Sequence, residues 1–147
     1  MLYEIYKMIF SKSCEYALKS VIYLSANAKD DNKANVKEIS NAINSPEPFT
    51  AKILQQLSKQ KLITSTKGPN GGFYIAKSTK PITIYKVIEA IEGPDFFDRC
   101  ILGLSDCSNK KPCPLHEYFV KHRTELKELF IQKTISDISS VEKLILK

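Results

Sequence analysis

The sequence contains no tryptophan, two histidines and five glycines among its 147 residues. Glycine is too scarce for a low-complexity chain, and a hydrophobic fraction of 43% is enough for the core of one domain. No apolar stretch approaches the length of a membrane span. The segment 1–10 is apolar, but it contains Glu4 and Lys7 and lacks a small-residue cleavage site, so no signal peptide is predicted. We therefore expect a cytoplasmic location.

A catalytic centre is not indicated either. Only two histidines are present, and His122 has no acidic partner that a motif would fix beside it. The sequence shows no recognisable combination of a nucleophile, a base and a group that orients the base. We predict that the protein is not an enzyme.

Basic residues outnumber acidic ones. The chain has 22 lysines and arginines against 16 acidic residues, which gives a formal net charge of +6 and a pI of about 9.1. This balance favours a polyanionic partner, either nucleic acid or an acidic membrane face. A surplus of lysine that only keeps the protein soluble is the alternative that charge alone leaves open.

Hydrophobic periodicity predicts a mainly α fold with a small β-hairpin. The expected elements are a helix over 11–28, a helix over 35–43, a helix over 49–61, a strand over 62–66, a turn over 67–72 and a strand over 73–76. Two short helices that follow a longer one across a tight connection are typical of a helix-turn-helix. A hairpin directly after the third helix is a wing. We place this winged helix-turn-helix domain at residues 8–80.

The remaining residues, 81–147, are predicted to form a fourth helix, a cysteine-rich loop and a long helix. Thr83 is expected to cap the fourth helix, and Gly93 is expected to end it. The long helix, from Leu115 to about Lys133, carries an apolar stripe that must be buried. We expect it to pack against a second subunit as a dimerisation helix, with packing onto its own domain as the alternative.

The candidate DNA-binding residues lie on the third helix and at the wing. A helix in the major groove needs small, polar or basic side chains on its outer face. Glycines at a wing tip let the backbone approach DNA closely. The candidates are Thr50, Lys52, Gln55, Gln56, Lys59, Lys67, Gly68, Asn70 and Gly71. Replacement of Gln55 or Thr50 should change sequence choice more than bulk affinity.

Three of the four cysteines fall within fourteen residues, in the pattern Cys100-x6-Cys107-x5-Cys113-x2-His116. Three thiolates form a soft site suited to an iron–sulfur cluster or zinc. The wide gaps fit a loop wrapped around a cluster better than a zinc knuckle, whose ligands come in close pairs. Oxidation of the three thiols without any metal is a further alternative. Cys14, on the inner stripe of the first helix, is expected to be a core residue.

The chain resembles the Rrf-type winged helix-turn-helix regulators, the family that includes IscR and NsrR. The residues that carry the resemblance are the segments 15–18, 67–73 and 82–94 and the loop with three cysteines. The resemblance implies a homodimer that binds a double-stranded DNA operator, with no membrane partner. It also implies a cluster on Cys100, Cys107 and Cys113, with His116 or Glu15 of the opposite subunit as the fourth ligand.

These observations predict a transcriptional repressor whose operator affinity is set by an iron–sulfur cluster. The signal is redox state, nitric oxide or iron status. We favour His116 over Glu15 as the fourth ligand, and a [2Fe–2S] over a [4Fe–4S] cluster because the thiolate set is incomplete. An exposed cluster is labile in air, so the purified protein can be apo. The alternatives are a cluster-free regulator that senses thiol oxidation and a zinc-stabilised interaction module.

Overall fold

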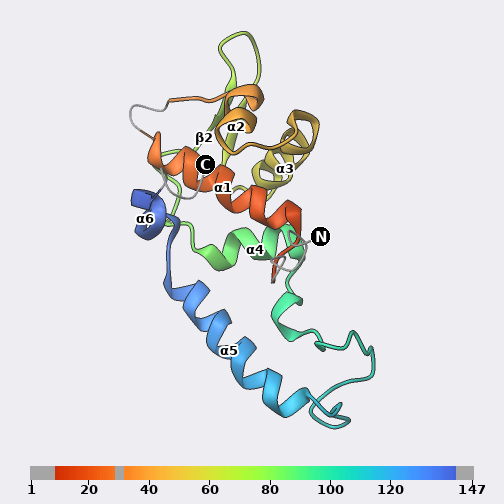
Figure 1. Ribbon diagram of the computed structural model, residues 1–147. Helices are drawn as coiled ribbons and strands as arrows, with labels where there is room; N and C mark the ends of the chain where they lie inside the picture. Colours follow the sequence, from red (N-terminus) through yellow and green to blue (C-terminus); the bar gives the residue numbers. More distant parts are fainter. Residues whose placement is uncertain (1–8, 29–31, 142–147) are drawn as a thin grey trace.

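The computed structural model describes residues 9–28 and 32–141 (Figure 1). The elements, in chain order, are α1 (Lys12–Ala26), α2 (Val36–Ala42), α3 (Glu47–Lys59), β1 (Thr64–Thr66), β2 (Gly72–Tyr74), α4 (Ile84–Glu92), the 3₁₀ turn η2 (Phe96–Asp98), α5 (His116–Gln132), α6 (Ile135–Ile138) and the 3₁₀ turn η3 (Ser139–Val141). This is the mainly helical fold with one hairpin that the sequence predicts. None of the helices in the described part of the chain is long and apolar enough to cross a bilayer.

The helix α1 begins and packs as its sequence predicts. The Ser11 hydroxyl accepts a hydrogen bond from the Cys14 amide (3.1 Å) and so caps the helix. Cys14, Ala17 and Val21 lie on one side and are fully buried. Burial of this stripe against α3 and α4 makes α1 the centre of the core.

The helix-turn-helix is formed by α2 and α3. Asn35 and Glu38 form the predicted capping box at the start of α2. The third helix begins at Glu47, two residues earlier than expected, because Pro48 in its first turn needs no amide partner. It ends at Lys59, before Lys61 takes a left-handed conformation with φ of 61°. The helix therefore lies slightly earlier in the chain than the predicted range.

The wing is an antiparallel hairpin in which Thr64 pairs with Tyr74 and Thr66 pairs with Gly72. Its strands are shorter than predicted, and its turn requires glycine. A Cβ atom at Gly71 would lie 2.3 Å from the Thr66 carbonyl oxygen. The hairpin is anchored to the segment before α2 by two hydrogen bonds between Ala34 and Phe73 (2.9 and 2.8 Å). These bonds hold the wing beside the helix-turn-helix.

The helices α4 and α6 share the core of the winged domain. Thr83 caps α4, and Gly93 ends it with φ of 95°, as predicted. The helix α6 was not predicted; the Ile135 amide donates to the Ile82 carbonyl oxygen (2.7 Å), and the Ile135 side chain is buried. We call residues 9–28, 32–92 and 134–141 the body. The predicted division after residue 80 stays a prediction, although residues on both sides of it contribute to one core.

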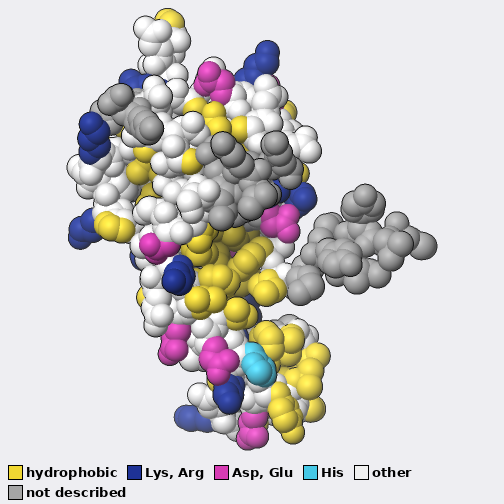
Figure 2. Space-filling view, turned by 60° about the vertical axis from the view of Figure 1, so that its left-hand side comes forward, with side chains coloured by type: hydrophobic (Ala, Val, Ile, Leu, Met, Phe, Trp, Pro, Cys, Tyr) yellow, Lys and Arg dark blue, Asp and Glu magenta, His cyan; other side chains and the backbone are white. Residues whose placement is uncertain are grey.

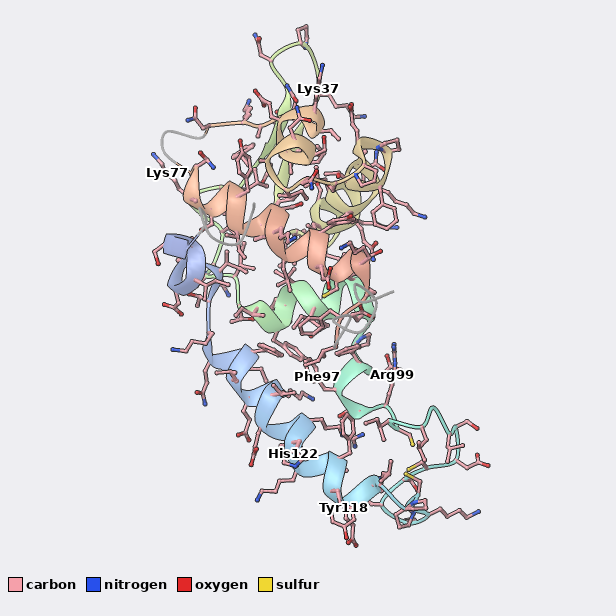
Figure 3. All side chains as sticks on the ribbon, in the orientation of Figure 1. Lys37, Lys77, Phe97, Arg99, Tyr118 and His122 are labelled. Carbon is pink, nitrogen blue, oxygen red and sulfur yellow. The ribbon has the colours of Figure 1, made fainter. Side chains whose placement is uncertain are left out.

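Residues 93–133 form an extension that we call the arm (Figure 1). It consists of η2, the cysteine loop and α5, which starts at His116 and ends at Gln132, close to the predicted range. Aromatic rings join the arm to the body: Phe97 of the arm lies 5.8 Å from Tyr85, and Phe130 of the arm lies 5.7 Å from Phe10, measured between ring centroids. Figure 3 shows Phe97 at this joint, between α4 and α5.

Candidate metal centre and nucleic-acid interface

The three predicted cysteines meet in the arm. The Sγ atoms of Cys100, Cys107 and Cys113 all lie within 4.8 Å of one another, and each side chain is half-buried. The sulfur atoms of Cys100 and Cys113 lie 3.7 Å apart. Figure 3 shows the loop that carries them, next to the start of α5. The chain thus forms a compact cluster of three thiols, all of them free.

Backbone turns bring the thiols together. The Gly103 amide donates to the Cys100 carbonyl oxygen (3.0 Å), and the Cys107 amide donates to the Leu104 carbonyl oxygen (3.3 Å). The His116 amide donates to the Cys113 carbonyl oxygen (3.0 Å) at the start of α5. Each cysteine is therefore held in or beside a short hydrogen-bonded turn, although the loop buries little apolar surface.

The thiols differ in acidity. The backbone amides of Leu104 and Leu102 lower the pKa of Cys100 to about 7, because hydrogen bonds to sulfur favour the thiolate. The Cys113 amide acts to lower the pKa of Cys107, but partial burial and the neighbouring thiols outweigh it, so the pKa is raised. Burial in the core raises the pKa of Cys14 to about 12. Cys100 is the thiol best suited to react or to bind metal at neutral pH.

His116 lies beside the cysteines. Its Nδ1 atom is 3.2 Å from the Cys107 Sγ, and its Nε2 atom is 2.9 Å from the Asn109 Oδ1. Four soft or borderline donor groups therefore come from a single loop. The sequence analysis named the histidine but not Asn109.

The donor set fits a metal. Metal–sulfur bonds of about 2.3 Å in a tetrahedron place two thiolate sulfurs about 3.8 Å apart. The 3.7 Å between the Cys100 and Cys113 sulfurs matches two ligands of one ion. The Cys107 and His116 donor atoms form a second close pair. Three thiolates and one imidazole are a donor set that could hold an iron–sulfur cluster or a single zinc ion.

Glu15, the other predicted fourth ligand, lies on α1 in the body. Its carboxylate pairs with the Lys12 ammonium (3.3 Å) on the same helix. It is not part of the cysteine group found in the described residues of one chain. A role for Glu15 as a ligand therefore requires a second subunit and stays a prediction. Cys14, as predicted, is a fully buried core residue.

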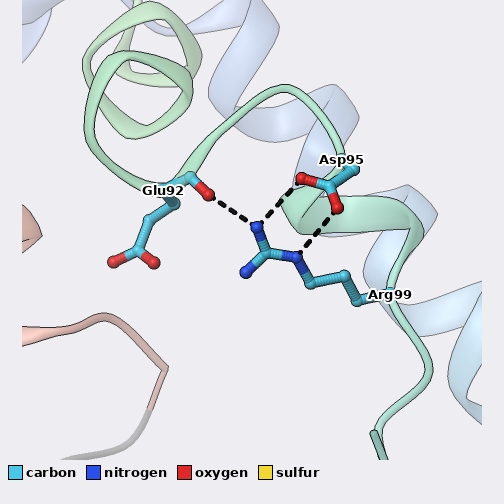
Figure 4. A network of polar contacts seen from close by, with 3 residues as sticks. All are labelled: Glu92, Asp95 and Arg99. Carbon is cyan, nitrogen blue, oxygen red and sulfur yellow. Dashed lines mark hydrogen bonds and ion pairs between the residues drawn. The ribbon is translucent and has the colours of Figure 1, made fainter. Parts of the chain in front are cut away.

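Arg99 ties the cysteine loop to the body, and sequence reasoning missed it. Its guanidinium donates to both Asp95 carboxylate oxygens (2.9 and 3.2 Å) and to the Glu92 carbonyl oxygen (2.7 Å) (Figure 4). The hydrogen bond from Arg99 lowers the pKa of Asp95. Because Arg99 directly precedes Cys100, this network fixes the start of the loop against the end of α4.

The end of α4 also contacts α1 and α3. The Glu92 carboxylate accepts from the Ser11 amide (3.1 Å) and from the Ser11 hydroxyl at the start of α1. The Gln56 side chain of α3 donates to the Ala90 carbonyl oxygen (2.9 Å). A continuous set of contacts thus runs from the cysteine loop through α4 to the helix-turn-helix.

Most predicted DNA-binding residues are exposed. On α3, Lys52, Gln55 and Lys59 are exposed, while Gln56 is exposed but has its amide bonded to α4. The wing tip exposes Lys67, Gly68 and Asn70, with Gly71 half-buried behind them. These residues form a polar and basic surface on the third helix and the hairpin.

The prediction that Thr50 lies on the outer face of α3 is wrong. Its side chain is fully buried, and its hydroxyl donates to the Pro46 carbonyl oxygen (2.9 Å) and contacts the Ser45 hydroxyl. Because α3 begins two residues early, Thr50 closes its first turn from inside. Lys37 is a basic residue that the analysis missed: it is exposed on α2, and Figure 3 labels it near the wing. In helix-turn-helix proteins the first of the two helices commonly crosses the DNA backbone, so the place of Lys37 on that helix could have indicated it from the sequence.

A helix-turn-helix with a hairpin wing defines a winged-helix DNA-binding regulator. The family model Rrf2, described as an iron-dependent transcriptional regulator, matches residues 10–140. The chain therefore belongs to the Rrf2 family of transcriptional regulators, as the sequence motifs indicated. Members of this family are DNA-binding regulators and not enzymes, which confirms that prediction.

Relatives support this assignment over nearly the whole chain. A protein of Aquifex aeolicus (strain VF5), provisionally named an HTH-type transcriptional regulator, is 35% identical over 137 residues, which are 92% of this chain and 94% of the relative. The HTH-type transcriptional regulator NsrR of Oceanobacillus iheyensis is 26% identical over 132 residues, covering 89% of each protein.

Solved structures show the same fold. The global cysteine regulator CymR of B. subtilis has a TM-score of 0.72 at 24% identity and covers 90% of this chain and 97% of its own. The IscR of T. potens has a TM-score of 0.68 at 20% identity and covers 90% of this chain and 86% of its own. At these identities the likeness concerns the fold alone.

Proposed function

We propose that this chain is a dimeric repressor whose operator affinity depends on an iron–sulfur cluster held by Cys100, Cys107, Cys113 and His116. The observation that carries the proposal is the meeting of three thiols within 4.8 Å, with the His116 Nδ1 atom 3.2 Å from the Cys107 Sγ. The family description as iron-dependent regulators agrees with it. The incomplete thiolate set favours a [2Fe–2S] over a [4Fe–4S] cluster.

The proposed dimer uses the apolar side of the arm. Leu115, Tyr118 and Leu129, which share one side of α5 and its start, are all at least 43% exposed, which is unusual for large apolar side chains of one helix. Figure 2 shows hydrophobic side chains gathered where the arm meets the body and again at its far end. A second copy that packs along α5 would cover them and set the spacing between two reading heads.

The proposed DNA contacts divide by role. Gln55 and Lys52 on α3 are placed to read base edges and phosphates in the major groove. Lys67 and the exposed turn at Gly68 and Asn70 are placed to contact the backbone beside it. Thr50 is no longer a candidate, since its side chain is fully buried.

The arm would transmit the state of the cysteine site. When bound, the cluster would supply reversible redox chemistry and a target for oxidants or nitric oxide. The residues of this chain would couple the site to the body. The turns around Cys100 order the loop, and Arg99 fixes that loop to the end of α4. A change in loop order would then alter how α4 supports α1 and α3, and how the two subunits are spaced.

Two measurements under anaerobic conditions test this proposal. The first is the visible absorption of the purified protein after reconstitution with iron and sulfide. The second is the affinity for an operator selected from a random DNA pool, with and without the cluster. We expect brown protein and different operator affinities in the two states. A variant without the three loop cysteines that still binds operator, and still responds to oxidant or nitric oxide like the parent, would contradict the proposal.

A second candidate function is thiol sensing without a metal. It is favoured by the 3.7 Å between the Cys100 and Cys113 sulfurs and by the lowered pKa of Cys100. A hydroperoxide would oxidise Cys100 to the sulfenic acid and leave as an alcohol or water, and the Cys113 thiol would then form the disulfide with loss of water. A colourless, metal-free protein that gains this disulfide would support it; a colourless protein that contains zinc would instead support a zinc-stabilised module.

A further inference from the structure

We propose that Asn109 is a positioning residue of the metal centre, which makes the Nδ1 atom of His116 the metal-binding nitrogen. The inference rests on the proposed function, because it requires His116 to be a ligand. Its basis is the hydrogen bond of 2.9 Å between the His116 Nε2 and the Asn109 Oδ1. The opposite ring nitrogen, Nδ1, faces the Cys107 sulfur.

The argument begins with the chemistry of neutral imidazole, which carries one N–H group and one lone pair. The Asn109 carbonyl oxygen can only accept, so it selects the form in which Nε2 carries the hydrogen. The lone pair is then on Nδ1, on the side of the cysteines. Metal-bound histidines commonly donate their other N–H to an oxygen in this way, and the contact fixes both the tautomer and the ring orientation.

The backbone holds both partners independently of the contact between them. Asn109 lies in a turn closed by two reciprocal hydrogen bonds between Ser108 and Lys111 (both 3.1 Å). His116 is the first residue of α5, and its amide is bonded to the Cys113 carbonyl oxygen. The backbone on each side therefore leaves the His116 ring and the Asn109 side-chain amide little freedom to move apart. Such pre-organisation is what a ligand of limited affinity needs.

The contact also explains how a neutral nitrogen can complete a site that has only three thiolates. Without an acceptor at Asn109, water could bond either ring nitrogen, and the ring would be free to turn away from Cys107. The cost would appear as weaker metal binding rather than as loss of the fold, because Asn109 is exposed and lies in the arm.

The test uses the full-length, metal-free protein titrated with cobalt(II) under anaerobic conditions, whose visible bands report a tetrahedral thiolate site. For Asn109→Leu, which keeps the size of the side chain and removes the acceptor, we expect about 10- to 100-fold weaker binding. Asn109→Asp, which keeps the oxygen, should bind about as well as the parent. Lys110→Gln, at an exposed position in the same turn, is the matched control and should have little effect.

A second set of variants shows whether Asn109 acts through His116. In a His116→Ala background, Asn109→Leu should cause little further loss, because the two changes remove the same interaction. The cobalt bands of Asn109→Leu should also move toward those of His116→Ala. An equal loss in both backgrounds would mean that Asn109 only maintains the loop, and it would overturn the inference.

The outcomes separate this inference from the proposed function. Parent protein that binds cobalt through the cysteines, together with an Asn109→Leu variant that binds equally well, would overturn the role of Asn109 and leave the metal site intact. Parent protein without a thiolate–cobalt band would overturn both. Loss of binding in Asn109→Asp as large as in Asn109→Leu would also contradict the acceptor role.

Discussion

The body and the arm are held together by different interactions. The body buries almost all of the core residues, among them Val21, Leu54, Ile88 and Ile135. In the described arm, Phe97 is the only hydrophobic residue of that buried set, and the helix α5 buries none of its residues fully. Apolar burial is therefore the main interaction that stabilises the body. The arm depends on turns, on the Arg99 network and on whatever binds its cysteines.

The largest expected effect separates the cysteines of the two regions. Replacement of any one of Cys100, Cys107 or Cys113 by alanine should abolish or severely weaken cluster retention, because three thiolates leave none to spare. Cys14→Ala should keep the cluster and cost on the order of 1 kcal/mol of stability, since it only removes core volume. Visible absorbance of the anaerobic protein and thermal unfolding measure the two quantities. A colourless Cys14→Ala variant would contradict the expectation that only the cysteines of the arm hold the cluster.

The same contrast should appear in thiol reactivity of the metal-free protein. At pH 7 a thiol with a pKa of about 7 is half ionised, whereas a pKa of about 12 leaves on the order of 10⁻⁵ as thiolate. Alkylation of Cys100 should therefore exceed that of Cys14 by a factor of at least about 10², because the greater nucleophilicity of the more basic thiolate offsets part of the difference in ionisation. The rate at Cys100 should be half-maximal at about pH 7 and should level off more than about one pH unit above that value. Mass spectrometry of peptides after timed iodoacetamide treatment measures it.

The link between the regions can be broken at Arg99. Arg99→Gln removes the bidentate contact with Asp95 and the contact with the Glu92 carbonyl oxygen. It also removes the guanidinium from the Phe96 ring, whose centroid lies 5.9 Å away, but it leaves all three thiols in place. We expect cluster absorbance to persist while the ratio of operator affinities with and without cluster falls toward one. Typical coupling between sites corresponds to a ratio of about 5 to 150.

Lys121→Gln, at an exposed position on α5, is the control for this change, and it should leave the ratio as in the parent. A parent-like ratio in Arg99→Gln would mean that the state of the loop reaches the DNA-binding face by another route, such as the dimer contact.

Within the body, variants at Gln55 and Thr50 should distinguish a residue that reads DNA bases from one that stabilises the fold. Gln55→Ala should relax the preference at one base position by about 1–3 kcal/mol. Thr50→Ala should instead lower stability by about 1 kcal/mol, because it removes a buried hydroxyl together with its hydrogen bond to Pro46, and should leave the preferred sequence unchanged. Binding-site selection and thermal unfolding of both variants distinguish the effects. A changed preference only in Thr50→Ala would contradict the proposed face.

The difference between the regions also explains what the sequence could predict. Periodic apolar residues and capping pairs such as Asn35 with Glu38 are local signals, so the helices of the body were predicted within about two residues. The helix α6 is four residues long and depends on a backbone contact between Ile135 and Ile82, far away in the chain, so no local pattern predicted it.

The metal centre was predicted only in part for a similar reason. Cysteine and histidine types show which residues can bind metal, and their spacing drew attention to His116. The roles of Asn109 and Arg99 depend on which atoms meet in a folded loop, and neither residue type is diagnostic alone. Thr50 was misplaced although its spacing from Ile53 and Leu54, three and four residues, already puts it on the inner face of α3.

The smallest expected effect compares one lysine of the wing with one of the arm. Lys67 is exposed at the wing tip, where a phosphate contact would release about one counterion from DNA. Lys67→Ala should therefore weaken binding to all sequences alike and reduce the slope of log affinity against log salt by about 0.9. Lys110→Ala removes the same charge from the exposed cysteine loop. Because both variants lower the net charge equally, only a direct contact explains a change in one of them.

The measurement is operator affinity at several salt concentrations for the parent and both variants. Equal slopes for Lys67→Ala and the parent would remove Lys67 from the DNA interface. A reduced slope for Lys110→Ala would show that the arm itself contacts DNA, and the division of labour between a DNA-reading body and a sensing arm would then fail. A reduced slope for Lys67→Ala alone places the phosphate contact on the wing, where its hairpin is fixed to the segment before α2 by the bonds between Ala34 and Phe73. The DNA-binding face would then consist of elements whose relative positions are set by the body and not by the state of the cysteine loop.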